Sequence, residues 1–248
     1  MVSAWAASNR LVLGQVATAE KSNEITAIPK LLERLALKGC IVTIDAMGCQ
    51  RAIAEQIIAQ GGDDVLGLKG NQSTVQEAVE EFFTTAVAGQ SAGVAHADTE
   101  ETDKDHGRLE IRRYWMTEDL RTLPHAVCWT GLRRIGMVER ECWQDGTQRI
   151  ERRDFIASIA ADTKRIAFAV RGHWGVEKRL PWRLEDVVFG EDACRIRKGQ
   201  APAIMTAIRH CCVNLLEKEG SSLSMAHKRR KAAWNDDYRA KVLWPVDD

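Results

Sequence analysis

Two carboxylates in the sequence stand where they could take part in chemistry, Asp45 and Glu177. Asp45 directly follows Cys40–Ile44, a run of apolar and β-branched residues that predicts a buried strand because it is too short for a helix. A carboxylate at the end of such a strand lies at the carboxyl edge of a sheet, where open α/β sheets bind their ligands. Asp is also a common turn residue, so its position leaves a catalytic role and a turn role open.

Glu177 belongs to a segment with helical spacing. His173 and Glu177 are four residues apart and share a helix face, beside an apolar stripe that contains Val170 and Trp174. A carboxylate next to a core stripe is half buried and needs a partner, which a divalent metal or an arginine would provide. The alternative is a surface glutamate paired with a basic neighbour such as Arg171.

The elements before residue 90 follow an α/β order. Val2–Ala6 and Arg10–Val16 flank a Ser8-Asn9 turn and predict a hairpin. Hydrophobic periodicity then predicts helix Ile25–Lys38, strand Cys40–Ile44, helix Cys49–Gln60, strand Val65–Leu68 and helix Val75–Ala86. This alternation of strands and helices indicates the α/β fold class.

The middle of the chain has the period of a strand. Leu109–Trp115 alternates between apolar and polar residues, and Leu132–Trp143 and Arg149–Ile159 are joined through Asp145-Gly146, a strong hairpin signal. We therefore predict an antiparallel β insertion in this region.

Helical spacing returns after residue 160. Helices are predicted over residues 163–179 and 202–219, the second with Ile204 and Ile208 on its buried stripe. The segment His227–Lys231 that follows is basic and is expected to be an exposed tail.

These patterns divide the chain into three expected parts. Residues 1–90 form the first part of the core, residues 91–160 a β-rich insertion, and residues 161–248 a helical region that carries Glu177 and completes the core. The whole chain is neutral, with 35 Lys and Arg and 35 Asp and Glu, but residues 164–248 hold 17 basic against 11 acidic residues. This basic C-terminal part suggests a face that binds a polyanion. A solvated charged surface is the alternative.

The composition, with 45% hydrophobic and 28% charged residues, is typical of a soluble globular protein. No apolar run approaches the roughly 18 residues that a membrane span requires. Seven scattered cysteines are expected to be free thiols in a reducing cytoplasm. A metal site at His210-Cys211-Cys212 is disfavoured, because zinc ligands are rarely adjacent in sequence.

Six ordered segments of the chain resemble one family of proteins. They are Glu20–Ile28, Ile41–Gln50, Leu68–Gln72, His106–Arg108, Arg171–Glu177 and Arg195–Gly199, and the similarity runs from residue 2 to about residue 243. In residue type and spacing they resemble the DDE transposases of bacterial insertion sequences related to the H-repeat-associated proteins.

The resemblance implies a ribonuclease H-like catalytic core that carries out metal-dependent phosphodiester cleavage and strand transfer in DNA transposition. By motif, Asp45 corresponds to the second Asp and Glu177 to the Glu of the DDE triad, both as metal ligands, with the β insertion between them. Two Mg²⁺ ions are the expected cofactors, with Mn²⁺ as a substitute, because carboxylate oxygens suit these hard cations. The expected partners are DNA, at the element ends and at the target, and other transposase subunits. The expected location is the bacterial cytoplasm, at the nucleoid and not at a membrane.

Further polar residues, most of them in the matching segments, are candidates for binding DNA. Contacts of this kind position a duplex through its phosphates without reading its sequence. For the loop at residues 69–72, a plain turn is the alternative. The candidates are Lys69, Asn71, Gln72, Arg108, Arg112, Arg113, Arg171, His173, Arg195, Arg197 and Lys198.

The chain departs from the family pattern in two places. The resemblance puts the first catalytic Asp on a strand before the segment that matches Met1–Trp5, so the core is expected to lack its first strand and one carboxylate. After Glu177, the family commonly has Asn next and His before the following Trp, where this chain has Lys178 and Pro181. Two interpretations remain, a transposase whose start lies upstream or a truncated, non-catalytic protein that binds DNA or regulates transposase subunits. In both cases the 248 residues alone are not expected to catalyse strand transfer.

Alanine at Arg195, Arg197 and Lys198 should weaken the binding of duplex DNA of any sequence, and the Lys228–Lys231 cluster is expected to add similar contacts. Each phosphate contact contributes about 0.9 unit to the slope of log affinity against log salt concentration, so removing three contacts lowers the slope by up to about 3 units. Fluorescence anisotropy over a salt series measures both quantities. Unchanged affinity and slope would make the three residues ordinary surface.

Overall fold

The computed structural model of the protein describes residues 1–18, 24–89, 94–103, 108–160, 163–181, 189–190 and 193–244, with backbone alone at 87–89, 95–103, 108, 163 and 174–181. The elements are β1 (Val2–Ala6), β2 (Leu11–Val16), α1 (Glu24–Leu32), β3 (Ile41–Ile44), η1 (Ala46–Gly48), α2 (Arg51–Ala59), β4 (Asp63–Gly67), η2 (Gly70–Gln72), α3 (Ser73–Gly89), β5 (Ala95–Asp103), β6 (Arg108–Thr117), η3 (Ala126–Cys128), β7 (Arg134–Gln144), β8 (Thr147–Ala157), α4 (Thr163–Pro181), α5 (Ala201–Lys218), α6 (Met225–Trp234) and α7 (Asp236–Leu243). The chain forms two compact units, a central unit of Glu24–Arg171 and a terminal unit of Met1–Asn23 with Gly172–Asp248.

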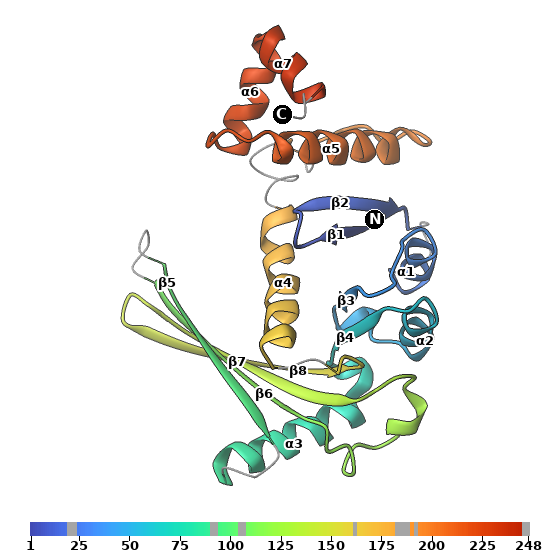
Figure 1. The fold of residues 1–248 in the computed structure, drawn as a ribbon, viewed down its shortest axis with the longest axis vertical. Coiled ribbons are helices and arrows are strands. Elements are labelled where there is room, and N and C mark those ends of the chain that lie inside the picture. The colour runs from blue at the N-terminus through green and yellow to red at the C-terminus, as the bar shows by residue number, and fades with distance from the viewer. Residues whose placement is uncertain are drawn as a thin grey trace. The chain divides into compact units, whose positions relative to one another are not determined.

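A six-stranded mixed sheet organises the central unit, in the order β3-β4-β8-β7-β6-β5 (Figure 1). β3 and β4 run parallel, with Ile44 opposite Leu66, and all other neighbouring strands are antiparallel. The predicted antiparallel β insertion is therefore confirmed. β8 joins it to β4 directly, with Ile156 opposite Leu66, and the central unit is a mixed α/β structure.

The β7–β8 hairpin turns through Asp145-Gly146, as predicted. Both residues have positive φ, 50° and 74°, which is the backbone that a two-residue type I′ turn requires. β5 lies within the region predicted to be β-rich, but Ala95–Asp103 was not itself identified as a strand, because it is rich in acidic residues, which strands disfavour. Its pairing with β6 over its whole length makes it a strand.

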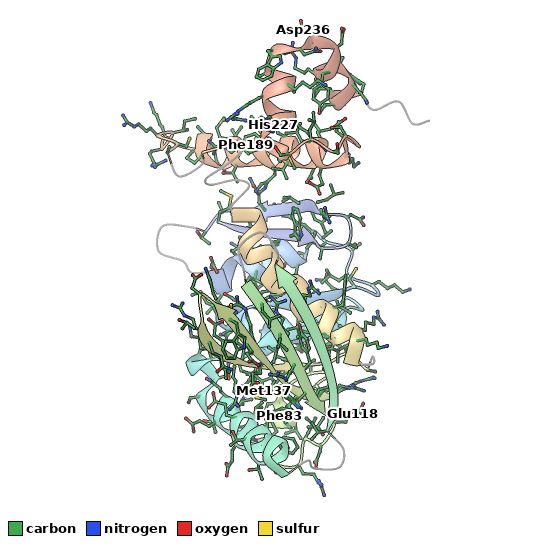
Figure 2. All side chains as sticks on the ribbon, turned by 90° about the vertical axis from the view of Figure 1, so that its left-hand side faces the viewer. Phe83, Glu118, Met137, Phe189, His227 and Asp236 are labelled. Atoms are coloured by element: carbon green, nitrogen blue, oxygen red, sulfur yellow. The ribbon has the colours of Figure 1, made fainter. Side chains whose placement is uncertain are left out.

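Helix α3 packs against β7 and β8 and supplies much of the core of the central unit (Figure 1). Phe83 of α3 is fully buried and Met137 of β7 is 4% exposed, and both belong to one apolar cluster (Figure 2). The buried members of this cluster are Cys49, Ala54, Leu66, Leu68, Val75, Val79, Phe83, Leu123, Trp129, Ile135, Met137 and Ile156. The cluster spans α2, α3, β4 and the insertion, so these elements share one core.

In the terminal unit, the predicted hairpin of β1 and β2 is present, and α5 lies against it. The side-chain amide of Asn214 in α5 bonds both backbone groups of Val12, accepting from its N–H and donating to its carbonyl, each at 2.8 Å. The amide of Gln15 donates to the carbonyl of Ala203 at 2.9 Å. Asn214 thus satisfies the backbone of β2 as a neighbouring strand would.

Glu219 connects α5 with α6 and α7. Its carboxylate accepts hydrogen bonds from the hydroxyl groups of Ser221 and Tyr238 and pairs with Lys228 at 3.4 Å. Although burial acts in the opposite direction, the hydrogen bonds from Ser221 and Tyr238 lower the pKa of Glu219 to about 2.

Two predictions about helices are wrong in detail. α1 ends at Leu32 rather than near Lys38, because the chain tightens into short turns (the Leu35 N–H donates to the Leu32 carbonyl at 3.1 Å) before Gly39 reverses it with φ of 74°. In α5, Ile204 and Ile208 are not buried but 56% and 48% exposed. The face around Asn214 is the one that packs on the hairpin.

Within the described residues, no helix is both long and apolar enough to cross a bilayer. All seven cysteines are free thiols.

The β4–β8 joint carries buried carboxylates. The Asp64 N–H donates to the Ser158 hydroxyl at 2.7 Å, and the Ser158 N–H donates to the Asp64 carboxylate at 3.2 Å. Burial raises the pKa of Asp64 from 3.8 to about 6. Burial, together with the nearby Glu80 carboxylate, raises the pKa of Asp154 to about 7.

The stability of the central unit should therefore fall as the pH rises from about 4 to about 7. In this window the unfolded carboxyls of Asp64 and Asp154 have lost their protons while the folded ones still bind them, so deprotonation favours unfolding. Asp64→Asn keeps an acceptor for Ser158 without the charge, and at pH 8 it should be more stable than the parent by on the order of 1–3 kcal/mol. At pH 4 the difference should vanish. Thermal unfolding over a pH series measures this.

Asp145→Asn is the matched control, since it removes a carboxylate at an exposed turn. Its effect should not change between pH 4 and pH 8. A pH-independent effect of Asp64→Asn would contradict the assignment.

Candidate active site

Asp45 leaves β3 directly into the η1 turn. It is the N-cap of η1, with extended backbone (φ −68°, ψ 176°), and its Oδ1 accepts a hydrogen bond from the Gly48 N–H at 3.3 Å. The residue as a whole is exposed. The turn role considered from the sequence is therefore present, and it leaves the carboxylate open to solvent.

The loop after β4 lies beside this turn. Because β3 and β4 are parallel, their carboxyl ends meet at one edge of the sheet. The side-chain amide of Asn71 donates to the carbonyl of Ala46 at 2.6 Å, and that of Gln72 donates to the carbonyl of Cys49 at 3.0 Å. The structure thus brings two predicted groups together, Asp45 and the 69–72 loop.

The side of the η1 turn that faces the protein interior is tightly packed. Cys49 is fully buried, and burial raises the pKa of its thiol to about 12. A Cβ atom on Gly48 would stand 2.8 Å from Ile28 Cδ1 and closer still to Ile44 Cγ2, and one on Gly67 would stand 3.3 Å from the Ala46 nitrogen. Sequence reasoning did not single out Gly48 or Cys49. The signal was a small residue and a thiol, three and four residues after a strand-end carboxylate.

Other predicted site residues are distributed differently. Glu177 lies in α4, as the helical spacing predicted, but its side chain and that of Arg108 lie outside the described residues. Arg171 is exposed and His173 half-buried on the same helix. Within the described residues, no three His, Cys, Asp or Glu side chains form a group that could hold a metal.

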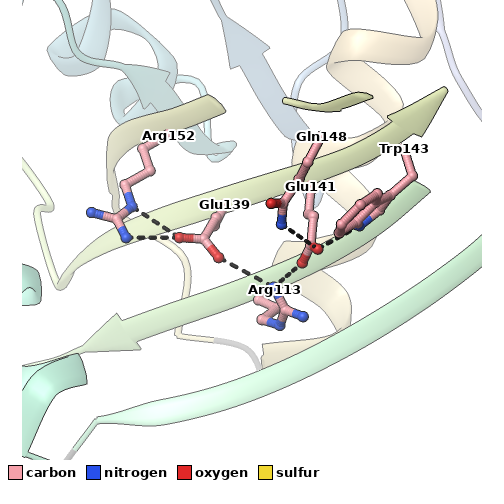
Figure 3. Close-up of polar contacts among 6 residues, drawn as sticks. All are labelled: Arg113, Glu139, Glu141, Trp143, Gln148 and Arg152. Carbon is pink, nitrogen blue, oxygen red and sulfur yellow. Dashed lines mark hydrogen bonds and ion pairs between the residues drawn. The ribbon is translucent and has the colours of Figure 1, made fainter. Parts of the chain in front are cut away.

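Two arginines of the insertion are engaged by carboxylates of the protein. Arg113 pairs with Glu139 at 3.2 Å and with Glu141 at 2.8 Å (Figure 3), and Arg112 pairs with Glu110. The hydrogen bond that the Arg113 guanidinium donates to the Glu141 carboxylate is the main reason that the pKa of Arg113 is raised. These ion pairs stabilise the sheet and compete with the phosphate contacts predicted for both arginines.

The cations near the C-terminus fall into two groups. Arg195, Arg197 and Lys198 are exposed in one segment before α5, which leaves them accessible to a polyanion. The prediction of an exposed basic segment at His227–Lys231 holds in part, because the segment lies in α6 with His227, Arg229 and Arg230 exposed but Lys228 buried. Lys228 is 7% exposed, and its ammonium group donates to the Leu216 carbonyl at 3.2 Å.

Comparison with known proteins identifies the family. Residues 1–215 match the family profile described as "Transposase DDE domain". The chain is 39% identical over 249 residues to "H repeat-associated putative transposase YhhI" and to "Putative protein YbfL", both of Escherichia coli (strain K12), and 38% identical over 252 residues to "Putative transposase YncI" of Escherichia coli O157:H7. Each alignment covers 98% of this chain, and the chain spans 65%, 65% and 63% of the lengths of YhhI, YbfL and YncI.

The chain belongs to the DDE transposase family. The resemblance to the H-repeat-associated transposases that the six sequence segments indicated is confirmed.

Gly48→Ala should destabilise the central unit by about 1–3 kcal/mol, because the new methyl group overlaps Ile44 and Ile28. Gly70→Ala is the control in the neighbouring loop, since nothing lies within 4 Å of the added Cβ. It should change stability by less than about 0.5 kcal/mol. Urea denaturation of both variants measures the difference, and equal midpoints would contradict the close packing of the turn.

Proposed function

We propose that this chain forms part of the catalytic core of a DNA transposase, in which Asp45 and Glu177 are two of the carboxylates that hold divalent metal. The observation that carries the proposal is the exposed Asp45 carboxylate at the carboxyl end of a parallel strand pair, within a segment that matches the family. The reaction would be phosphodiester cleavage and strand transfer at element ends.

A ribonuclease H-like core is part of this proposal. It is supported by two parallel strands, β3 and β4, with α2 between them in sequence and the carboxylate directly after the first strand. The division into 1–90, 91–160 and 161–248 stays a prediction.

The chemistry of Asp45 fits Mg²⁺ or Mn²⁺, which prefer hard oxygen ligands. The hydrogen bond from Gly48 to Oδ1 restricts the side-chain rotamer, and exposure keeps the carboxylate accessible. Bound metal ions of this kind stabilise the attacking and leaving oxygens of an in-line displacement at phosphorus. Glu177, four residues after His173 on α4, would supply the second carboxylate.

DNA would be held by basic residues apart from the metal ligands. Arg195, Arg197 and Lys198 support this part of the proposal because all three are exposed. Lys69, exposed at the start of η2, is the candidate beside Asp45, and Arg171 and His173 are further candidates.

A second candidate function is non-catalytic binding of DNA, as a regulator of transposase subunits. The exposed cations at 195–198 favour it equally, since phosphate contacts need no metal. The two candidates differ only in whether Asp45 and Glu177 bind metal together.

Metal-directed cleavage of the protein backbone separates these candidates. Fe²⁺ with ascorbate and peroxide, added to the purified chain, produces hydroxyl radicals that cut the peptide backbone beside a bound ion. The catalytic proposal predicts cuts near both residue 45 and residue 177, because carboxyl groups that share metals lie within about 12 Å of each other. Excess Mg²⁺ should suppress both cuts.

Asp45→Asn and Glu177→Gln should each remove both cuts, while DNA binding persists. Asp145→Asn is the control and should leave the cuts in place. DNA binding without any localised cut would favour the non-catalytic function.

A further inference from the structure

We propose that Asn71 and Gln72 are positioning residues, which hold the η1 turn and with it the Asp45 carboxylate at the edge of the sheet. The inference rests on the proposed role of Asp45 as a metal ligand. It gives these two amides a function different from the phosphate contacts that their sequence context suggests.

The η1 turn has weak internal support. It is a single 3-10 turn of three residues, a geometry with poor hydrogen bonds. Its backbone bonds lie at the upper end of the usual range, 3.1 Å from the Gly48 N–H to the Asp45 carbonyl and 3.2 Å from the Cys49 N–H to the Ala46 carbonyl. A turn of this kind needs contacts from outside to keep one conformation.

The two amides bond the turn at both ends. Asn71 bonds Ala46, the first residue of η1, and Gln72 bonds Cys49, the residue after its last. The metal-binding side chain of Asp45 is thereby fixed through the backbone that follows it. Outer partners that orient a ligand in this way commonly change metal affinity by about 10- to 100-fold when removed.

The amides themselves stand on a rigid support. Asn71 and Gln72 lie in η2, which runs directly into α3. Val75 is 3% exposed and Val79 fully buried in the core of the central unit. α3 thus connects the packing of the core to the turn that carries Asp45.

Two variants remove the amide donors: Asn71→Ala at the exposed position, where the lost volume leaves no cavity, and Gln72→Met, which keeps a similar shape, at the half-buried one. Gln76→Met is the matched control, since the Gln76 amide donates to Glu80 within α3 at 2.6 Å and not to the turn. Amide hydrogen exchange by NMR is the first readout. Exchange at Gly48 and Cys49 should accelerate by about 5- to 30-fold, as expected for the loss of one or two hydrogen bonds.

Binding of Mn²⁺ is the second readout, followed by paramagnetic broadening of amide signals around Gly48. The double variant Asn71→Ala/Gln72→Met should need about tenfold more Mn²⁺ for the same broadening. Affinity for duplex DNA in the absence of metal should stay unchanged. A fall in that affinity, with unchanged exchange at Gly48, would overturn the positioning role in favour of phosphate contacts.

The outcomes separate this inference from the proposed function. Loss of Mn²⁺ binding in Asp45→Asn, with normal binding in the amide variants, overturns the positioning role alone. Normal Mn²⁺ binding in Asp45→Asn overturns the proposed function. If the double variant is unfolded, Asn71→Ala alone decides, because Asn71 is exposed and its loss leaves the core intact.

Discussion

The pairing of β4 on both edges is the constraint on which the central unit depends. β3 lies along one edge and β8 along the other, and Leu66 of β4 is fully buried. The carboxyl end of β4 is therefore fixed, and the Leu68 N–H still bonds the Asp154 carbonyl at 2.8 Å beyond the strand. The η2 loop starts from this fixed point and reaches the turn after β3. The sheet therefore determines where the η1 turn and the η2 loop of the candidate site lie.

The pairing of β4 on both edges also buries polar groups at the place where β4 meets β8. β4 has a parallel neighbour, β3, on one edge and an antiparallel neighbour, β8, on the other. Asp64 and Ser158 form a hydrogen bond with each other at the point where the β4–β8 pairing ends. A buried carboxylate is stable there only with hydrogen bonds or a proton, because burial disfavours its charge. In the β insertion, partly buried carboxylates are instead paired with arginines. Arg113 and Arg152 both pair with the carboxylate of Glu139 (Figure 3), whose side chain is only 12% exposed, so the two positive charges compensate its partial burial.

An element of this fold could be predicted from the sequence where local contacts determine its conformation, and could not where distant contacts do. The hairpin at Asp145-Gly146 and the strand before Asp45 were predictable, because turn chemistry and a β-branched run are local signals. β5 lies in the region predicted to be β-rich but was not identified as an individual strand, since its acidic sequence lacks a local strand signal and its pairing with β6 makes it one. The buried face of α5 was also missed, because Ile204 and Ile208 have the spacing of a core stripe but the partner of the helix, the hairpin, meets Asn214 instead. Lys228 was expected on the surface because its sequence neighbours are basic, whereas distant contacts with the Leu216 carbonyl and the Glu219 carboxylate hold it in the interior.

Within the site, the position of the carboxylate was predictable and its support was not. One oxygen of the Asp45 carboxylate caps η1 while the residue as a whole stays exposed, so the observed turn role is compatible with the proposed metal-binding role. Asparagine at this position can still cap the turn but carries no charge, whereas alanine removes the cap and the charge together. A loss of metal binding in Asp45→Asn is therefore attributable to the chemistry of the carboxylate, and the further loss in Asp45→Ala to the turn. If the turn is held by Asn71 and Gln72, that further loss should be small, because the backbone of η1 keeps its external bonds when the cap is gone.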